Sequence, residues 1–567
     1  MKPEFLRRIR IISIIIFFLG LVLVGRLYFV QVMHGGEYSD EADRQYTRPN
    51  QSLYSRGSIF LQDKNGTLVS GATLKSGFIV AINPKILVDP KSAYEKLSEI
   101  IDIDEDSFFF RAGKKDDTYE EIAKHIDEER AYRISDLEID GINIYKDRWR
   151  FYPGNDMASQ TLGFVGFIGD EFSGRYGLER YYEDTLERGE DEIYVNFFAG
   201  IFANINSTVF KNGNRSGDVI TSIEPSVQLF LENKLDEVSE KWNSKLTAGV
   251  IINPQNGEIQ AIGVNPSFNL NSFQKVENPS VFSNPIVESV YEMGSIIKPL
   301  TMAAGIDSGA ITATTTYYDA GSIELDGSTI SNFDGKGRGR VSMQEVLNQS
   351  LNTGASFVAS KIGNRVFANY MINYGIGEET GIDLPNESAG IVKNLYEPRD
   401  LEYATASFGQ GIATTPIATI RGLSVLANGG VLVTPRIAKK IKYTSGLSKK
   451  VSSNDGQRIL KQESAEEITR MLVSVVDNAL LEGTVKLPNY SIAAKTGTAQ
   501  IASVGGYYDD RFLHSFFGYF PAYDAQYLIF LYTLEPKEVK YASQTLTHPF
   551  MDIVKFLINY YEIPPDR

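Results

Sequence analysis

The first strongly apolar stretch of the chain is Ile11–Val24, which contains no charged residue. Four basic residues precede it, at positions 2, 7, 8 and 10. A helix needs about 20 apolar residues to cross a bilayer, and the long side chain of Arg26 can reach the interface, so we predict a transmembrane helix over residues 9–32. The basic flank places the tail, residues 1–8, in the cytoplasm and the rest of the chain outside. A cleaved signal peptide is the alternative, although no Ala-x-Ala site follows.

The stretch that follows alternates between short strands, turns and charged helices. Ile59–Leu61 and Leu68–Val69 flank Asp63-Lys-Asn-Gly66, and Asn-Gly between apolar runs predicts a β-hairpin. Tyr94–Ile101 and Tyr119–Ile134 alternate apolar and charged positions, which predicts amphipathic helices with solvated faces. The glycines after residue 150 mark turns, and we interpret them as structural. Residues 33–215 therefore form a separate mixed module without chemistry of its own.

A domain boundary is expected near residue 216. The apolar run that begins at Gly217 predicts a strand, and Ser226–Trp242 has the periodicity of a helix. Thr247–Ile262 predicts a hairpin, with two apolar strands around Pro-Gln-Asn-Gly. From there to the end, predicted strands bracket a helical middle. That order is typical of an antiparallel sheet with helices packed on it, so residues 216–567 are predicted to form an α+β domain.

Composition narrows the chemistry that this domain can perform. The 567 residues carry a net charge of −15, which argues against a nucleic-acid partner. There is no cysteine, so disulfides, thiolate nucleophiles and cysteine metal sites are excluded. Only four histidines occur, so few residues are available to form a histidine metal cluster or a Ser-His-Asp triad. A nucleophilic serine in this chain is therefore expected to use a lysine as its base.

Ser295 and Lys298 fit that expectation. The small-residue turn Gly294-Ser295 opens an apolar helix, and residues three apart lie on one helical face. This spacing lets a hydroxyl meet the amine that activates it, and the helix start offers unpaired N–H groups to a developing negative charge. The same spacing in Ser272 and Lys275 is a decoy, because no apolar helix follows it.

A lysine base must be neutral, which burial and a neighbouring cation both favour. A second lysine is therefore expected close by. Lys495, Thr496 and Gly497 follow a strand-like stretch, and Gly497 would let an extended substrate lie along that strand edge. Ser350 and Asn352 supply a hydroxyl and an amide two positions apart in a predicted loop. The order of the three segments within one domain matches the set found in penicillin-binding proteins and serine β-lactamases, with Ser-Leu-Asn in place of Ser-Asp-Asn.

With these three segments the chain resembles the class B penicillin-binding proteins, the monofunctional peptidoglycan transpeptidases. The resemblance extends over nearly the whole chain, and it includes the basic tail and the apolar stretch. Its further motifs are Arg56-Gly57, Asp63-x-Asn65-Gly66, Tyr152-Pro153, Gly177-Leu-Glu179, Gly217-Asp218, Thr380-Gly-Ile-Asp-Leu-Pro385 and Phe408-Gly-Gln-Gly-Ile-Ala-Thr-Thr-Pro416. One departure is Met293, where the family usually has proline before the glycine.

The resemblance implies a fold: a single transmembrane helix, a stalk or dimerisation-like module over residues 33–215, and a penicillin-binding transpeptidase domain. It also implies roles for the site residues. Ser295 would attack the penultimate D-Ala of a D-Ala-D-Ala stem peptide, and Lys298 would take its proton. Ser350 would protonate the departing D-Ala, and Lys495 would tune the electrostatics. The backbone N–H groups of Ser295 and Thr498 would form the oxyanion hole. Asn352 would contact the substrate amide, and Thr496 and Thr498 would bind the terminal carboxylate of the substrate.

The same resemblance implies that no metal or organic cofactor is needed and that β-lactams would acylate Ser295. Expected partners are the donor and the amine acceptor of two stem peptides, a multi-span glycosyltransferase, and division or elongation proteins, with no nucleic acid. The chain would sit in the cytoplasmic membrane with its catalytic domain outside. Septal division and lateral elongation both stay open, with a slight preference for division.

Two other functions are weighed. A β-lactamase or D,D-carboxypeptidase would resolve the acyl-enzyme with water, and the long N-terminal module argues against it. A non-catalytic membrane-anchored scaffold would not need both lysines. His514 is predicted to be a core histidine, and the basic loop Gly335–Arg340 is predicted to be solvated.

Overall fold

The computed structural model describes residues 54–168, 171–188, 216–452, 456–503 and 505–567. These residues fall into two compact units, one of residues 54–55 and 74–149 and the other of residues 56–73 and 150–567. Within the described ranges no helix combines the length and the apolar composition that a membrane crossing requires. The predicted cytoplasmic tail and transmembrane helix, residues 1–8 and 9–32, lie outside these ranges.

The smaller unit packs three helices against a short antiparallel sheet. Its elements are the second half of β2 (Leu68–Ile82), α3 (Pro90–Ser98), α4 (Glu105–Ala112), β3 (Glu120–Ile126), α5 (Glu128–Ser135) and β4 (Ile142–Phe151). An aspartate caps each helix by accepting a backbone N–H: Asp89 from Ser92, Asp104 from Ser107, and Asp127 from Arg130.

The helix predicted over Tyr94–Ile101 is confirmed in large part by α3. The single helix predicted over Tyr119–Ile134 is wrong in its first half, because Glu120–Ile126 pairs with β2 as a strand. The Asp127 cap then starts a new helix. The amphipathic pattern over Tyr119–Ile134 therefore covers two elements, a strand and a helix, and the capping residue Asp127 marks the boundary between them.

In the larger unit, the predicted hairpin around Asn65-Gly66 is confirmed. β1 (Ile59–Gln62) pairs antiparallel with β2, with Gln62 opposite Leu68. β1 also runs parallel to β7 (Gly217–Thr221), which continues the sheet through β15 (Ala438–Tyr443) and β16 (Ser448–Lys450).

The motifs around residues 56 and 179 meet beneath this sheet. The Glu179 carboxylate, with no exposed surface, accepts from Arg56 Nε at 2.7 Å and Arg150 Nε at 2.5 Å. Short elements surround the cluster: α6 (Ser159–Leu162), β5 (Val165–Ile168), β6 (Glu171–Gly174), α7 (Gly177–Tyr181) and α8 (Glu183–Leu186). Of the glycines predicted to mark turns, Gly154 lies in a turn, but the prediction is wrong for Gly166 and Gly174, which lie in β5 and β6, and for Gly177, which begins α7. The charged residues in this region form a buried ion-pair network.

The centre of the larger unit is a five-stranded antiparallel sheet, in agreement with the predicted α+β fold. Its strand order is β18 (Ala493–Ser503), β19 (Gly506–Phe520), β20 (Tyr527–Leu534), β8 (Leu246–Ile252) and β9 (Ile259–Asn265). The predicted hairpin of β8 and β9 is confirmed, and so is the helix that follows β7, which runs over Pro225–Trp242 as α10. β18, which carries Lys495, is an edge strand of this sheet.

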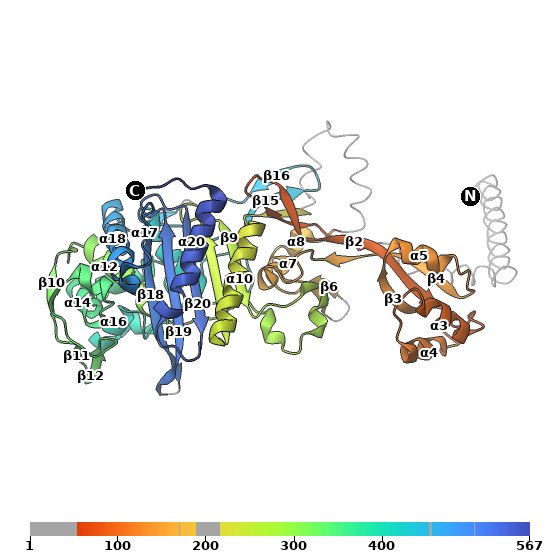
Figure 1. Cartoon of the computed structure of the whole chain (residues 1–567), viewed down its shortest axis with the longest axis horizontal. Helices are drawn as coiled ribbons and strands as arrows, with labels where there is room; N and C mark the ends of the chain where they lie inside the picture. Colours follow the sequence, from red (N-terminus) through yellow and green to blue (C-terminus); the bar gives the residue numbers. More distant parts are fainter. Residues whose placement is uncertain (1–53, 169–170, 189–215, 453–455, 504) are drawn as a thin grey trace, which may run out of the picture. The chain divides into compact units, whose positions relative to one another are not determined.

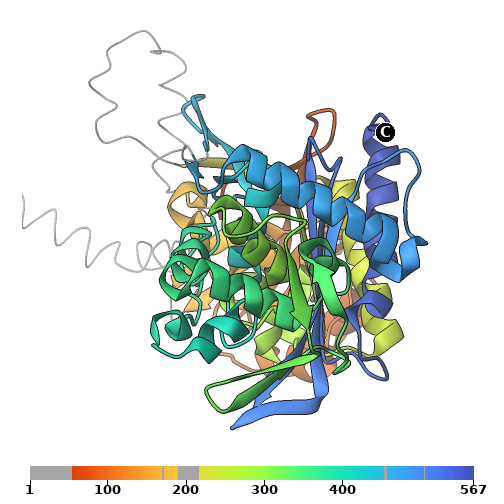
Figure 2. The ribbon, with the colours of Figure 1, turned by 90° about the vertical axis from the view of Figure 1, so that its left-hand side faces the viewer.

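Helices cover both faces of the sheet (Figure 1). On one face α10 and α20 (Thr547–Tyr561) bury apolar side chains against Ile251, Phe516 and Ile529. On the other face α12 (Lys298–Asp307), α17 (Pro416–Ala427) and α18 (Gln462–Ser474) pack against Val250 and Phe517. Figure 2 looks onto this second, helical layer. Both layers exclude water from the sheet, so the buried side chains at the start of its edge strand, Lys495 among them, are held in a low-dielectric setting.

The helical layer is completed by further helices and by an excursion of the chain. The helices are α11 (Pro285–Glu288), α13 (Met343–Asn348), α14 (Asn352–Ile362), α15 (Asn364–Asn373) and α16 (Asp400–Ala406). The short helix α19 (Ala542–Thr545) directly precedes α20 and contacts His514 on the same face of the sheet as α20. Between α12 and α13 the chain forms β10 (Thr316–Asp319), β11 (Ser322–Leu325), β12 (Ser328–Ser331) and β13 (Gly339–Ser342), with β10 paired to β13 and β11 to β12. Smaller elements are the pair β14 (Val431–Leu432) with β17 (Gln457–Arg458), and short helical turns η3 (Leu270–Lys275), η4 (Pro279–Phe282), η5 (Gly294–Ile297), η6 (Lys393–Tyr396), η7 (Val475–Ala479) and η8 (Leu480–Gly483).

Candidate active site

Ser295 lies in the single 3-10 turn η5, directly before α12 begins at Lys298. Side chains three apart are eclipsed in a 3-10 turn, so Ser295 and Lys298 share one side of it. Ser295 is partly exposed, whereas its neighbours Gly294 and Ile296 are buried. The turn therefore presents the hydroxyl to solvent and the amine to the interior.

Two hydrogen bonds and the close approach of β18 hold this turn in place. Gly294 N donates to Gly409 O at 3.1 Å, and the Ser515 hydroxyl donates to Met293 O at 2.9 Å. A Cβ on Gly497 would lie 2.8 Å from Met293 O and 2.3 Å from Ser515 Oγ. The missing side chain of Gly497 thus lets β18 pass directly against the Ser295 turn.

The Lys298 amine points into the protein and is 1% exposed. Its Nζ lies within hydrogen-bond distance of three oxygens: the Ser350 carbonyl at 2.6 Å, Ser350 Oγ at 3.2 Å and Asn352 Oδ1 at 2.8 Å. Burial, and to a lesser degree the charge of Lys495, hold the pKa of Lys298 well below its usual range. A neutral amine is the form that can accept a proton.

Lys495 approaches the same hydroxyl from β18. Its Nζ donates to Ser350 Oγ at 3.0 Å and to Thr496 O at 2.9 Å, and the side chain is 3% exposed. Burial lowers the pKa of Lys495 to about 7. Ser350, in the left-handed region at φ 55° between α13 and α14, therefore sits between two buried lysines.

The structure thus brings together four of the candidate site residues, Lys298, Ser350, Asn352 and Lys495. Among the described residues no hydrogen bond joins Ser295 to Lys298, whose amine is directed to Ser350 and Asn352 instead. Ser295 and Lys298 are related in this structure by their spacing of three positions across the start of α12.

Thr496 and Thr498 lie on the opposite side of β18 from Lys495 and Gly497, because side chains alternate along a strand. Both threonines are partly exposed. Thr498 Oγ1 accepts from Ala542 N at 3.1 Å, at the start of α19. The proton of that hydroxyl is left for another acceptor.

Comparison with known proteins places this geometry in a family. Residues 247–555 match the model for the penicillin binding protein transpeptidase domain, and residues 53–215 match that for the penicillin-binding protein dimerisation domain. The chain belongs to the class B penicillin-binding proteins. It is 30% identical over 541 residues to the stage V sporulation protein D of Bacillus subtilis, covering 94% of this chain and 82% of that protein.

Two further similarities agree with the family. A probable peptidoglycan D,D-transpeptidase, PenA, of Neisseria meningitidis is 25% identical and covers 98% of this chain and 93% of its own. The crystal structure of penicillin binding protein 2X from Streptococcus thermophilus has the same fold, with a TM-score of 0.71, 21% identity and coverage of 90% and 81% of the two chains.

In this penicillin-binding protein, some residues that support the site were not predicted. Ser515 and Gly409 fix the Ser295 turn, yet neither belongs to one of the three motifs. Gly409 lies in the motif Phe408–Pro416, one of those that carry the family resemblance, and that motif was the only sequence signal that pointed to Gly409. His514 is confirmed as a core residue: it is fully buried, contacts Thr545 Oγ1 and Lys540 O at 3.0 Å, and burial lowers its pKa to about 4.

Proposed function

We propose that this protein is a peptidoglycan D,D-transpeptidase that crosslinks stem peptides through an acyl-enzyme on Ser295, in septal or lateral wall synthesis. The observation that carries the proposal is the Ser350 hydroxyl held between the buried amines of Lys298 and Lys495, beside the Ser295 turn. The D,D-transpeptidase named among the relatives supports the same reaction class.

In the first step Ser295 Oγ attacks the carbonyl carbon of the penultimate D-Ala while neutral Lys298 takes the hydroxyl proton. Burial keeps Lys298 in the neutral form that this step requires. The carbonyl oxygen gains negative charge, which the backbone N–H groups of Ser295 and Thr498 stabilise. Donors fixed in a dry site stabilise such a charge without reorganising.

Collapse of the tetrahedral intermediate breaks the bond to the terminal D-Ala and leaves an ester on Ser295. The departing amine needs a proton, and Ser350 lies within hydrogen-bond distance of both lysines. The proton taken by Lys298 therefore passes through the Ser350 hydroxyl to the leaving D-Ala, while Lys495 sustains the positive potential. An amine of a second stem peptide then attacks the ester, forms the crosslinking amide and returns the proton to Ser295.

The remaining site residues hold the donor. Asn352 contacts its backbone amide, and Thr496 and Thr498 bind its terminal carboxylate. The Thr498 hydroxyl already accepts from Ala542 N, so its own proton is directed to an acceptor such as that carboxylate. The outer edge of β18 beside Gly497 can pair with an extended peptide as an added strand.

The rest of the chain supports this domain in our proposal. Residues 1–8 form a cytoplasmic tail, 9–32 a single transmembrane helix, 33–215 a stalk or dimerisation-like module, and 216–567 the transpeptidase domain outside the cytoplasmic membrane. A multi-span glycosyltransferase and other division or elongation membrane proteins would supply and direct the substrate. β-Lactams would acylate Ser295 in place of the donor.

The test uses the full-length protein, a fluorescent penicillin, and a D-Ala-D-Ala donor with an amine acceptor. We expect a persistent adduct and an amide-linked product from wild type and neither from Ser295→Ala. Ser272→Ala, in the decoy Ser272/Lys275 pair, is the matched control and should behave as wild type. An undiminished adduct in Ser295→Ala would refute the assignment of Ser295 as the nucleophile. Hydrolysis of the donor without a crosslinked product would refute the proposed transpeptidase activity.

A further inference from the structure

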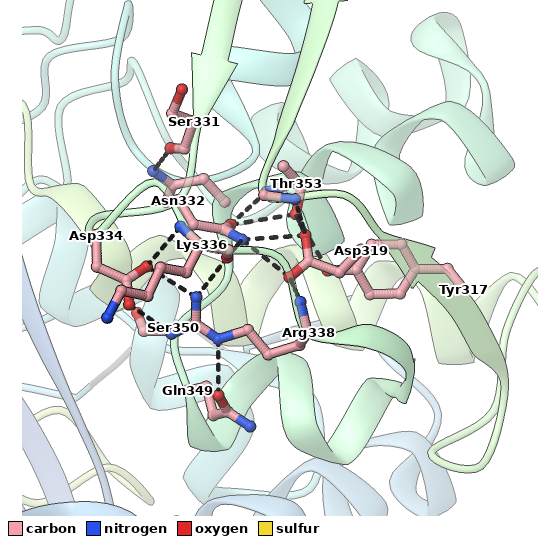
Figure 3. Close-up of polar contacts among 12 residues, drawn as sticks. Tyr317, Asp319, Ser331, Asn332, Asp334, Lys336, Arg338, Gln349, Ser350 and Thr353 are labelled. Carbon is pink, nitrogen blue, oxygen red and sulfur yellow. Dashed lines mark hydrogen bonds and ion pairs between the residues drawn. The ribbon is translucent and has the colours of Figure 1, made fainter.

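The excursion over residues 316–342 packs on the loop that carries Ser350 and Asn352 (Figure 3). It leaves the helical layer after α12 and returns at α13, so the chain itself does not require it to contact that loop. The contacts between the two are nevertheless specific, polar and largely buried. This raises the question of what the excursion does for the site.

Asp319, at the end of β10, is the centre of these contacts and is 1% exposed. Its carboxylate accepts from Gly321 N at 3.0 Å, Arg338 N at 3.0 Å, the Thr353 hydroxyl at 2.8 Å, and Asn332 Nδ2 at 3.0 Å to each oxygen. A buried carboxylate that accepts this many fixed donors defines their relative positions closely. Asp319 thereby connects the excursion to Thr353, the residue after Asn352.

Asn332 completes the same connection. Its Oδ1 accepts from Thr353 N at 3.3 Å, while its Nδ2 is held by Asp319. The preceding carbonyl, of Ser331, accepts from Asn352 Nδ2 at 2.8 Å. Because the Asn352 amide nitrogen is bound there, its Oδ1 is turned toward Lys298, at 2.8 Å.

Arg338 holds the other end of the loop. Its Nε donates to Gln349 Oε1 at 3.0 Å, and its two Nη atoms donate to the Asp334 carboxylate at 2.8 and 2.9 Å. The prediction that Gly335–Arg340 is merely a solvated loop is therefore wrong for Arg338. Its guanidinium contacts the loop that carries Ser350, at Gln349, and its backbone N–H donates to Asp319 within the excursion.

The loop needs such support because Ser350 has a positive φ of 55°. A non-glycine residue in this region is strained and persists only where its surroundings fix it. The conformation matters, since it directs both the carbonyl and the hydroxyl of Ser350 to Lys298. The segment is fixed on both sides of Ser350, at Gln349 and at Asn352-Thr353, by residues of the excursion.

We propose that Asp319 and Asn332 are positioning residues for acyl transfer, which set the place of Ser350 and Asn352 against the buried amine of Lys298. This inference rests on the proposed function, because it assigns the pair a task in that reaction. A misplacement of about 1 Å in such a group costs about 10²-fold in rate. The pair acts through Ser350 and Asn352 and does not touch the substrate.

The test measures acylation of the full-length protein by a fluorescent penicillin. Asn332→Asp keeps the shape of the side chain but sets a second carboxylate against Asp319 and removes the amide donor. We expect the rate constant at saturating penicillin to fall about 10²-fold, with a smaller change in the half-saturating concentration. The exchange Asp319→Asn with Asn332→Asp restores one amide facing one carboxylate and should recover the rate to within about tenfold of wild type.

Asn364→Asp is the matched control, because Asn364 Nδ2 donates to Asp400 Oδ1 at 2.7 Å in an exposed pair. It should acylate at the wild-type rate. A wild-type rate in Asn332→Asp, or a loss confined to the amount of protein that can be acylated, overturns the positioning role while the proposed function stands. If wild type itself is not labelled on Ser295, the proposed function fails instead.

If Asn332→Asp does not fold, Thr353→Val tests the positioning role instead. It deletes only the hydroxyl that donates to Asp319. A fall in the saturating rate of about tenfold supports the inference, and an unchanged rate overturns it.

Discussion

The amines of Lys298 and Lys495 meet at one hydroxyl, that of Ser350, at 3.2 and 3.0 Å. One lysine belongs to the first turn of α12 and the other to the edge strand β18, nearly 200 residues apart. Each is buried, and each has its pKa lowered. This arrangement has consequences for acylation and for stability that can be measured separately.

Removing the charge of Lys495 should change the pH dependence of acylation. A neighbouring cation favours the neutral form of Lys298, so Lys495→Met raises the pKa of Lys298. Lys298 then becomes a base only at higher pH, and the rising limb of the rate against pH moves upward. We also expect the rate at pH 7 to fall about 10²- to 10³-fold, because a preorganised positive group near the reacting carbonyl is lost.

Rates of labelling by a fluorescent penicillin between pH 5 and pH 10 check this expectation. The exposed Lys361, changed to Met, is the control and should leave the profile unchanged. If the rate of labelling rises at the same pH in Lys495→Met as in wild type, the charge of Lys495 does not affect the pKa of Lys298.

The same variant should be more stable than wild type at neutral pH. The pKa of Lys495 is about 7 in the folded protein and about 10.4 in the unfolded chain, so the unfolded chain binds more protons between these values. The free energy of unfolding of wild type therefore rises with pH across that window. Lys495→Met lacks this dependence, and it should gain about 2 kcal/mol at pH 7 after allowance for two lost hydrogen bonds.

Urea unfolding at pH 7 and pH 10 measures the difference. The advantage of Lys495→Met should shrink as the pH rises toward 10. An advantage that is absent at pH 7, or that grows with pH, contradicts the assignment of Lys495 as a destabilising buried amine.

Gly497→Ala should slow acylation by about 10²-fold or more. The new Cβ would stand 2.3 Å from Ser515 Oγ and 2.8 Å from Met293 O, so β18 and the Ser295 turn must separate. Gly506→Ala on the neighbouring strand, where a Cβ meets nothing within 4 Å, should have no effect, and equal losses in both glycine variants would count against this explanation.

Glu179→Gln should destabilise the larger unit by about 3–5 kcal/mol, because it leaves Arg56 and Arg150 buried without their shared charge partner. The acylation rate of the protein that stays folded should not change, since the cluster lies outside the site. Glu467→Gln, which breaks a surface pair with Arg470, should cost at most about 1 kcal/mol. Denaturant unfolding compares the two, and similar losses would mean that burial of the ion pairs is unimportant.

Local patterns were sufficient for much of the fold, and the order of three short motifs was sufficient to propose the site residues. The hairpin at Asn65-Gly66 and the strands around Pro254 are set by neighbouring residues, so the sequence predicted them. Ser350 and Lys495 could be predicted because their order after Ser295 and Lys298 matches the set found in penicillin-binding proteins. The strand at Glu120–Ile126 was missed, since its pairing partner β2 is far away in the chain.

The residues that hold the site were beyond local patterns for the same reason. Asp319, Asn332 and Thr353 are separated by 13 to 34 positions and share no spacing. Arg338 looked like one charge in a basic, glycine-rich loop, and only the folded chain shows that its partner is Gln349. Side-chain contacts between distant segments leave no periodic signal in one sequence.

In the described part of the chain, no carboxylate is among the hydrogen-bond partners of either lysine at the Ser350 hydroxyl. A protein of net charge −15 thus has, among its described residues, a site where an entering anion meets no carboxylate and, near or below pH 7, meets the positive charge of Lys495. The buffer should therefore affect measurements on this protein. Sulfate, phosphate and small carboxylates are expected to bind weakly at this site, which would raise the melting temperature and slow labelling by penicillin. Inhibition constants for this protein are comparable only between experiments that share the same salts.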